Sequence, residues 1–217
     1  MGINIAIDGP AGAGKSTIAK NVANKKGFIY IDTGAMYRAM GYYAHKFGVD
    51  LDDESAIINM CDNSDIVIKY ENDNQVIYLN GENVNELIRT SEASMLASRV
   101  ASIPNVRIKL VDLQKKMAEL NDVVMDGRDI GTCVLPNAQV KVYLTAQPRV
   151  RAQRRYDEMI LKGIDCDLDV IEREIIDRDY ADMHREHSPL VQADDAILLD
   201  SSYMTIDEVT RKILGMI

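Results

Sequence analysis

The sequence predicts an α/β fold, in which a central parallel sheet has helices on both faces. Over the first fifty residues, short β-branched runs alternate with stretches of helical periodicity in the order β-α-β-α. That alternation is typical of parallel sheets in three-layer folds. Apolar runs at 123–125, 140–144 and 196–199 bring the number of expected strands in this sheet to five. A hairpin pattern in the middle of the chain predicts a small antiparallel insert.

The first four elements follow from local patterns. Residues 3–7 are a β-branched and alanine run that ends at Asp8-Gly9, which predicts a buried strand and a turn. Residues 15–26 place their apolar side chains on one helical face. Residues 28–31 predict a second strand, and residues 35–47 return to helical periodicity.

The middle of the chain carries the insert and two helices. Runs at 66–68 and 76–79 flank a polar turn at 71–74, and we expect Val84 to begin a third short strand. Helices are expected over 85–102 and 104–120, the second opened by Pro104. Pro148 then opens an arginine-rich helix that Gly163 ends, and an acidic segment at 165–169 begins another helix. A final helix is expected at 206–214.

Composition excludes several classes of protein. The chain has 217 residues and a net charge of 25 − 34 = −9, which argues against a protein that coats nucleic acid. No run of 18 apolar residues is long enough to span a bilayer. Cys61, Cys133 and Cys166 form no C-x-x-C pair, and the N-terminus lacks a signal-peptide pattern. We therefore expect free thiols and a cytoplasmic protein without a membrane partner.

The strongest motif is the glycine-rich stretch between the first strand and the first helix. Gly9–Ser16 fits G-x-x-x-x-G-K-[ST] at every fixed position. Glycines let the backbone approach phosphates, Lys15 would reach the β- and γ-phosphates, and the Ser16 hydroxyl would ligate Mg²⁺. A dinucleotide site is excluded because Thr17 stands where a third glycine belongs. The stretch at 24–27 lacks the Asp of a guanine-specificity motif, which disfavours a GTPase switch.

Two other strand ends carry charged turns. Asp32–Arg38 follows the second strand and would place Arg38 on the first turn of the next helix, where it could face phosphates. In the second turn, Asp126 has the position of a carboxylate near Mg²⁺. Arg128 adds a bidentate phosphate donor, and Asp129 is an acceptor suited to an exocyclic amine.

Arginines then gather in one helix. Arg151 and Arg155 share a face, with Arg149 and Arg154 in the same seven-residue window. Like charges so spaced repel, and a polyanionic ligand would relieve that repulsion. The helix and the one after it predict a mobile hairpin lid that excludes water from a transferring phosphate. On the second of these helices, one face carries an arginine, an acid and another arginine at positions 178, 182 and 185.

Together these blocks resemble the bacterial cytidylate kinases, a branch of the nucleoside monophosphate kinase family of P-loop kinases. The resemblance covers nearly the whole chain and is carried by 8–17, 32–38, 98–107, 126–132 and 178–190. It implies a three-layer P-loop kinase fold with a central five-stranded parallel sheet, an antiparallel β insert in the monophosphate-binding region and a helical arginine-rich lid. It also implies one domain over 1–217, with core segments 1–63, 86–147 and 184–217, an insert at about 64–85 and a lid at about 148–183. The family further suggests a monomer.

The resemblance implies transfer of the γ-phosphoryl group of ATP to CMP or dCMP, with Mg²⁺ as the metal. Residues implied to hold ATP are Gly9, Pro10, Ala11, Gly12, Ala13, Gly14, Lys15, Ser16 and Thr17, with Mg²⁺ at Ser16. Those implied to bind the acceptor are Thr33, Tyr37, Arg38, Ser98, Arg107, Asp126, Gly127, Arg128, Asp129, Arg178, Asp182 and Arg185. Those implied to act in catalysis are Lys15, Arg128, Arg151, Arg154 and Arg155.

Within these sets, the roles implied by the family are distinct. Arg38, Arg128 and Arg185 would hold the acceptor phosphate. Cytosine would be recognised by Ser98, Arg107 and Asp129, and the pentose by Arg178 and Asp182. Arg151, Arg154 and Arg155 would close over the transferring group. Two alternatives stay open: another small-molecule kinase, acting for example on UMP or AMP, and a P-loop switch that transfers no phosphoryl group.

Overall fold

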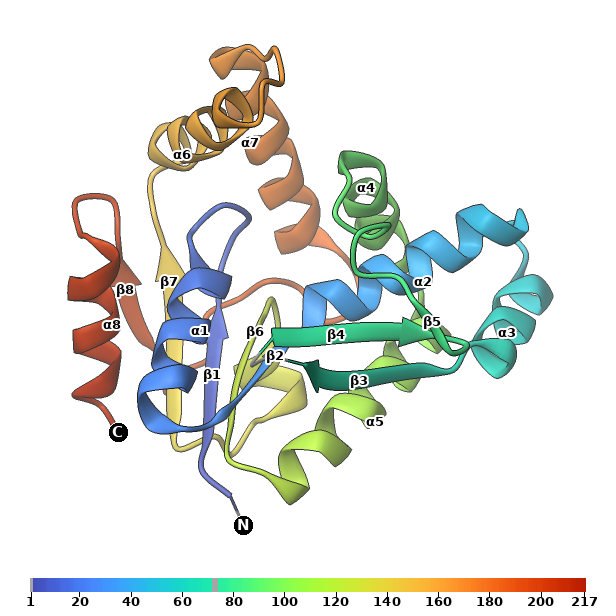
Figure 1. Ribbon diagram of the computed structural model, residues 1–217, viewed down its shortest axis with the longest axis horizontal. Helices are drawn as coiled ribbons and strands as arrows, with labels where there is room; N and C mark the ends of the chain where they lie inside the picture. Colours follow the sequence, from blue (N-terminus) through green and yellow to red (C-terminus); the bar gives the residue numbers. More distant parts are fainter. Residues whose placement is uncertain (1, 72–73) are drawn as a thin grey trace. The chain divides into compact units, whose positions relative to one another are not determined.

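The computed structural model describes residues 2–71 and 74–217, and the chain divides into two compact units (Figure 1). Unit 1 comprises Met1–Tyr30 and Leu120–Ile217, and unit 2 comprises Ile31–Glu119. The first boundary falls within strand β2 (Ile29–Asp32), and the second falls at the end of helix α5 (Pro104–Leu120). Unit 2 is therefore a long insertion between two neighbouring strands of the sheet in unit 1.

Unit 1 is built on a five-stranded sheet in the order β2-β6-β1-β7-β8, which confirms the predicted parallel sheet. Its other strands are β1 (Asn4–Asp8), β6 (Val123–Gly127), β7 (Val140–Thr145) and β8 (Ile197–Asp200). The central strand β1 runs parallel to both neighbours, and Asp8 is paired in register with Gly127. The chain therefore leaves β1 and β6 at the same edge of the sheet, where parallel α/β sheets bind their ligands.

Two helices of unit 1 cover one region of this sheet. Helix α1 (Lys15–Lys26) packs against β6 and against α8 (Ile206–Leu214). The buried face of α1 carries Ile18 and Val22, which join Val209 and Ile213 in one apolar cluster with the strands. The predicted periodicity of α1 is confirmed, because the side chains assigned to its apolar face are the buried ones.

A helical hairpin stands apart from the sheet within unit 1 (Figure 1). It consists of α6 (Pro148–Leu161) and α7 (Leu168–His184), which pack against each other around Ala152, Ile171 and Ile175. Gly163 adopts a left-handed conformation just after α6, and the Asp167 carboxylate caps α7. The predicted pair of helices is therefore present, with an apolar cluster of its own.

Unit 2 combines four helices with a three-stranded antiparallel sheet among the described residues. The helices are α2 (Thr33–Phe47), α3 (Glu54–Asn63), α4 (Ser91–Val100) and α5, and the strands are β3 (Ile66–Glu71), β4 (Asn74–Leu79) and β5 (Glu82–Asn83). Helices α2 and α4 approach closely at Gly41, where an added Cβ would lie 2.8 Å from the Cβ of Leu96. The glycine in the middle of α2 is thus a requirement of helix packing.

Some predictions for unit 2 were wrong. The third strand of the insert is Glu82–Asn83, and Val84 follows it as a buried residue of the apolar cluster. The helix expected from residue 85 begins at Ser91, because the Asn85 side chain is engaged by the sheet: its Oδ1 accepts from Ile77 N at 3.0 Å. Helix α3 was not predicted at all. The polar turn expected at 71–74 includes residues 72 and 73, which lie outside the described residues.

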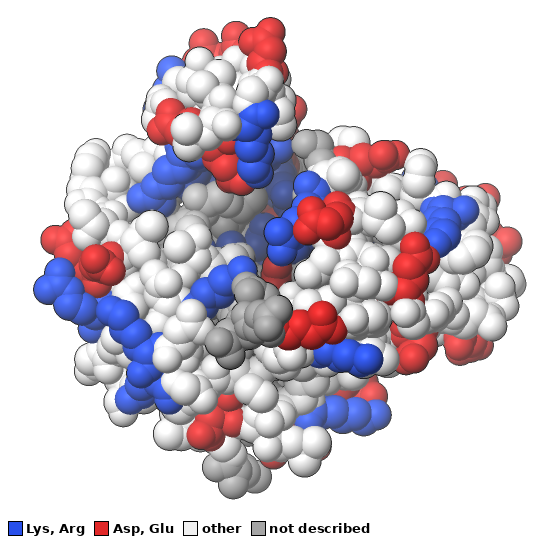
Figure 2. Space-filling view, in the orientation of Figure 1, with Lys and Arg blue, Asp and Glu red and all other residues white. Residues whose placement is uncertain are grey.

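The surface agrees with the composition. On the face shown in Figure 2, both acidic and basic side chains are exposed. Within residues 2–71 and 74–217, no helix is long and apolar enough to cross a bilayer.

Candidate active site

The glycine-rich loop forms the turn between β1 and α1. Gly9 has a φ of 149°, and a Cβ there would lie 1.9 Å from the carbonyl oxygen of Leu144. Gly12 and Gly14 also have left-handed φ values, 73° and 89°. Among the described side chains none caps the start of α1. Its first backbone N–H groups are therefore left for another acceptor, which is the arrangement of an anion-binding helix N-terminus.

Lys15 is buried at the first position of α1. Its Nζ donates to the carbonyl oxygen of Pro10 at 2.7 Å. Burial, with the nearby charge of Arg128, lowers the pKa of Lys15 to about 7. A bound phosphate would restore the charged form, since an opposite charge favours ionisation. The side chain is thus placed where a phosphate would stabilise its charged form.

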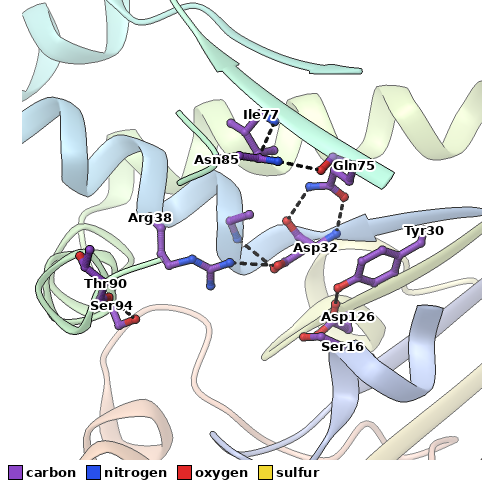
Figure 3. A network of polar contacts seen from close by, with 11 residues as sticks. Ser16, Tyr30, Asp32, Arg38, Gln75, Ile77, Asn85, Thr90, Ser94 and Asp126 are labelled. Atoms are coloured by element: carbon purple, nitrogen blue, oxygen red, sulfur yellow. Dashed lines mark hydrogen bonds and ion pairs between the residues drawn. The ribbon is translucent and has the colours of Figure 1, made fainter. Parts of the chain in front are cut away.

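Ser16 and Asp126 meet at the ends of α1 and β6 (Figure 3). The Ser16 hydroxyl donates to Oδ2 of Asp126 at 3.0 Å, and the Tyr30 hydroxyl donates to Oδ1 at 2.8 Å. No cluster of three or more His, Cys, Asp or Glu side chains that could hold a metal exists in the described part of the chain. A hydroxyl beside one carboxylate suits Mg²⁺, which takes few protein ligands and keeps waters and phosphate oxygens.

Asp8 is an additional residue of this region, to which the sequence analysis gave no role. Its two carboxylate oxygens accept from the backbone N–H groups of Ile130 (2.8 Å) and Gly131 (2.7 Å). These residues begin the π-helix η1 (Ile130–Val134), which follows β6. Burial raises the pKa of Asp8 to about 6, although the two backbone hydrogen bonds oppose that shift. The signal was present in the sequence, because Asp8, like Asp126, lies at the carboxyl end of a buried strand.

Two ion pairs connect the turn after β6 to helix α7 and to Arg185, which was expected on this helix but follows its last residue. Arg128 Nε lies 2.7 Å from Oδ2 of Asp182, and Arg185 Nη2 lies 3.7 Å from Oδ1 of Asp129. Burial opposes ionisation of Asp182, but the guanidinium of Arg128 outweighs it and the pKa of Asp182 lies below its ordinary value. Arg178, one turn before Asp182, adds to that effect and also acts on Lys15. The predicted face of α7 is therefore joined to the predicted turn after β6.

The arginines of α6 differ in their surroundings. Arg151 is buried and bonded to protein groups, including Asp179 of α7. Arg154 donates to the carbonyl oxygen of Ser201 at 2.7 Å, while Arg155 is one-third exposed and 3.8 Å from Glu174. Arg149 pairs on the surface with acids of α7. Four arginines in one sequence window thus occupy four different environments.

Unit 2 contains Asp32 and Arg38, the charged residues of the turn that was predicted after the second strand. Asp32 caps α2 by accepting from Ala35 N at 2.9 Å, and its other oxygen pairs with Arg38 at 2.9 Å. Gln75 of the antiparallel sheet accepts from Asp32 N at 2.8 Å (Figure 3). Arg38 was expected on the first turn of this helix. It lies on the second, because α2 begins at Thr33.

The remaining residues of unit 2 lie on three helices. Arg107 of α5 is buried, donates to the Ala101 carbonyl oxygen at 3.2 Å, and has its guanidinium 5.8 Å from the ring centroid of Tyr37. Thr33 and Tyr37 are buried on α2, and Ser98 is half-buried on α4. The contact of Arg107 with Tyr37 brings together two members of the predicted set.

These features define a class of protein. A glycine-rich loop between a central parallel strand and a helix, with Lys15, Ser16 and Asp126 at its end, is the architecture of the P-loop kinases. A shikimate kinase structure from Bacteroides thetaiotaomicron has this fold: it matches with a TM-score of 0.50 and 16% identity, over 99% of this chain and 97% of that one.

The chain belongs to the cytidylate kinase family, whose model matches residues 5–217. A cytidylate kinase of Lactobacillus johnsonii is 53% identical over 215 residues, which cover 99% of this chain and 94% of that protein. A cytidylate kinase of Ligilactobacillus salivarius is 50% identical over 215 residues, covering 99% and 96%. The similarity therefore spans both units as well as the P-loop.

Proposed function

We propose that this protein transfers the γ-phosphoryl group of ATP to CMP or dCMP, giving ADP and CDP or dCDP. The observation that carries the proposal is the register of β1 with β6, which brings the P-loop beside the turn at 126–129. One turn has the chemistry to hold a triphosphate, and the other offers Arg128 to an acceptor phosphate. Family membership over the whole chain supports cytidylate as that acceptor.

ATP would be held by the loop from Gly9 to Thr17. The glycines admit the phosphates to the backbone, and the N-terminus of α1 contributes its partial positive charge. Lys15 would take up a proton and bind the β- and γ-phosphates, which compensates for its burial. Ser16 and Asp126 would hold Mg²⁺, which supplies charge neutralisation to the phosphates when it is bound.

The monophosphate would bind to the side chains that the family resemblance implies. Arg38, Arg128 and Arg185 would hold its phosphate through bidentate hydrogen bonds, for which the planar guanidinium is suited. Arg178 and Asp182 would contact the pentose. Thr33, Tyr37 and Gly127 would also contact the monophosphate. The existing pairs of Arg38 with Asp32 and of Arg128 with Asp182 support this role, since they hold the guanidinium groups in place beforehand.

Cytosine recognition would rest on Ser98, Arg107 and Asp129. Cytosine presents an amine donor where uracil presents a carbonyl acceptor, so a carboxylate favours cytosine. A mispaired polar edge costs about 1–3 kcal/mol. Asp129 is buried and is oriented by Arg185, which supports selective recognition by this side chain.

The reaction needs no general base. The attacking atom is an oxygen of the monophosphate, whose second pKa near 6 leaves it largely deprotonated at neutral pH. Catalysis then depends on aligning two polyanions and neutralising charge in a loose transition state. Lys15 and Arg128 supply fixed positive charge from unit 1, and Arg154 and Arg155 would approach from α6 when the hairpin closes. We further propose a monomer that works in the cytoplasm.

The test is a panel of acceptors assayed with ATP and Mg²⁺. Purified protein is incubated with CMP, dCMP, UMP and AMP, and the products are separated by anion-exchange chromatography. We expect CMP and dCMP to be converted with the highest kcat/KM. Preferential conversion of UMP or AMP would replace the proposed substrate, and ATP hydrolysis without transfer to any monophosphate would favour a switch.

A single substitution sharpens the assignment of the base. Asp129→Asn replaces an acceptor-only carboxylate by an amide that can also donate. We expect the ratio of kcat/KM for CMP over UMP to fall by about 5- to 150-fold, corresponding to about 1–3 kcal/mol. Asp194→Asn, an exposed position far along the chain, is the matched control and should leave the ratio unchanged.

A further inference from the structure

Arg151 of helix α6 is enclosed by protein on all sides. Its side chain is only 4% exposed. Nε donates to the Ala146 carbonyl oxygen at 2.7 Å, and Nη1 donates to the Ala11 carbonyl oxygen at 2.9 Å. Nη2 lies 2.7 Å from Oδ2 of Asp179. Each of its three nitrogen atoms therefore has a partner on a different segment: the end of β7, the glycine-rich loop and helix α7.

The contact with Ala11 bears on how the loop binds anions. In a planar trans peptide, the carbonyl of one residue and the N–H of the next point in opposite directions. A guanidinium that holds the Ala11 carbonyl on the α6 side therefore turns the N–H of Gly12 to the opposite side. Backbone N–H groups that face inward are what a phosphate-binding loop uses to bind its ligand.

Packing at the same place restricts the loop further. A Cβ on Gly12 would lie 3.3 Å from the Cβ of Arg151, so the loop backbone rests directly on α6. Gly12 has a φ of 73°, a conformation that other residues rarely adopt. The loop is thus held at one peptide by a hydrogen bond and at the next residue by close packing, both from Arg151.

We propose that Arg151 is a positioning residue, which fixes the Ala11–Gly12 peptide of the glycine-rich loop for phosphate binding and does not itself contact the nucleotide. The proposal rests on the proposed nucleotide site. It separates Arg151 from Arg154 and Arg155, which lie nearer to solvent on the same helix. Through Asp179 it also links the order of the loop to α7, the helix that carries Arg178 and Asp182, the partner of Arg128.

The test compares two ways of cutting this network. Arg151→Met removes all three contacts, whereas Asp179→Asn removes the ion pair and leaves the bonds to Ala11 and Ala146. Binding of ADP and of inorganic tripolyphosphate is measured by isothermal titration calorimetry, and folding by thermal unfolding. We expect Arg151→Met to weaken both ligands by about tenfold or more, because the loop loses its fixed N–H groups. Asp179→Asn should lower the melting temperature while keeping both affinities within about twofold.

Arg151→Lys keeps the positive charge opposite Asp179 and provides a variant that folds if the methionine variant does not. A lysine cannot reach three partners, so we expect it to restore the melting temperature but only part of the affinity. A normal ADP affinity in a folded Arg151 variant would overturn the proposal. So would a fall in kcat with ADP affinity unchanged, which a direct contact with the transferring phosphoryl group would produce. Failure of the unaltered protein to bind ADP would instead refute the nucleotide site itself.

Discussion

The two units hold their charged residues in different ways. In unit 1 the groups around the P-loop are buried and bonded to one another, as in the pairs of Arg128 with Asp182 and Arg151 with Asp179. In unit 2 Arg38 is about one-quarter exposed and is paired within its own helix end, next to a large apolar cluster. In unit 1, these charged side chains are thus held by ion pairs with one another. In unit 2, Arg38 is held by a residue at the end of its own helix.

This difference predicts different costs. Removing one member of a buried pair leaves the other charge uncompensated, which is strongly destabilising. Removing one member of a partly exposed pair changes stability by about 1 kcal/mol or less. Substitutions in unit 1 should therefore change folding together with catalysis. A substitution of Arg38, in the partly exposed pair of unit 2, should change substrate use almost alone.

Lys15→Ala is expected to have the largest effect on activity. It is an exception to the rule for unit 1, because it should change catalysis without unfolding the protein. Removing a fixed cation from the developing charge of the transition state should reduce kcat by at least about 10²- to 10³-fold. The fold should survive, because burial lowers the pKa of Lys15 from 10.5 to about 7, so that burying this amine already costs folding energy at neutral pH. Coupled kinetics and thermal unfolding measure both. A variant that keeps one-tenth of the activity would contradict the role of Lys15.

Asp8→Asn tests whether a buried carboxylate controls the stability of unit 1. The pKa of Asp8 is raised to about 6 in the folded protein, against 3.8 ordinarily. Between about pH 4 and pH 6 the folded state therefore keeps a proton that the unfolded chain has lost, so stability falls as pH rises through this window. Two pKa units correspond to about 3 kcal/mol.

The asparagine variant lacks this titration. The difference in free energy of unfolding between it and the unaltered protein should therefore shift by about 2–3 kcal/mol in the variant's favour from pH 4 to pH 7. Urea unfolding at several pH values measures it, and Asp194→Asn serves as the control. A difference that does not change with pH would show that Asp8 has an ordinary titration.

Most of the fold could be predicted because the strands and helices of unit 1 follow from local patterns of apolar residues. The strands that flank the P-loop are continuous apolar runs, and helices α1 and α5 begin and end within one residue of their expected limits. Unit 2 was harder to predict where side chains override local propensity. Asn85 completes the hydrogen bonding of β4, so the helix expected there starts six residues later.

The candidate site could be predicted where its chemical groups are close together in the sequence. The P-loop and the turn at 126–132 are contiguous, and both lie at the edge of the sheet where parallel strands end. The partners of these groups were not predictable: Tyr30 and Asp179 are distant in sequence from Asp126 and Arg151. A strand tyrosine and a helical aspartate resemble ordinary structural residues until the fold brings them to a charge.

Arg38→Ala tests the other half of the comparison, in unit 2. We expect KM for the monophosphate to rise by about 10- to 100-fold, because one charge-assisted hydrogen bond is worth about 1.5–3 kcal/mol. The melting temperature should hardly change, since the pair with Asp32 is partly exposed. The measurement combines steady-state kinetics, in which both substrates are varied, with calorimetry of ADP binding. An equal loss of affinity for ATP would remove Arg38 from the acceptor site.

Tyr30→Phe is expected to have the smallest effect and asks how much one hydroxyl contributes to the order of unit 1. The Tyr30 hydroxyl donates to Asp126, which also accepts from Ser16, so the carboxylate is held from two sides. Loss of a buried hydrogen bond to a charged acceptor should lower the free energy of unfolding by about 1–3 kcal/mol. Tyr203→Phe is the matched control, because that ring is 86% exposed and its hydroxyl only accepts from Gln147 at 3.4 Å. If the two variants unfold at the same urea concentration, the Tyr30 hydroxyl contributes nothing measurable to holding Asp126. The charges of unit 1 would then be less interdependent than its network of contacts implies.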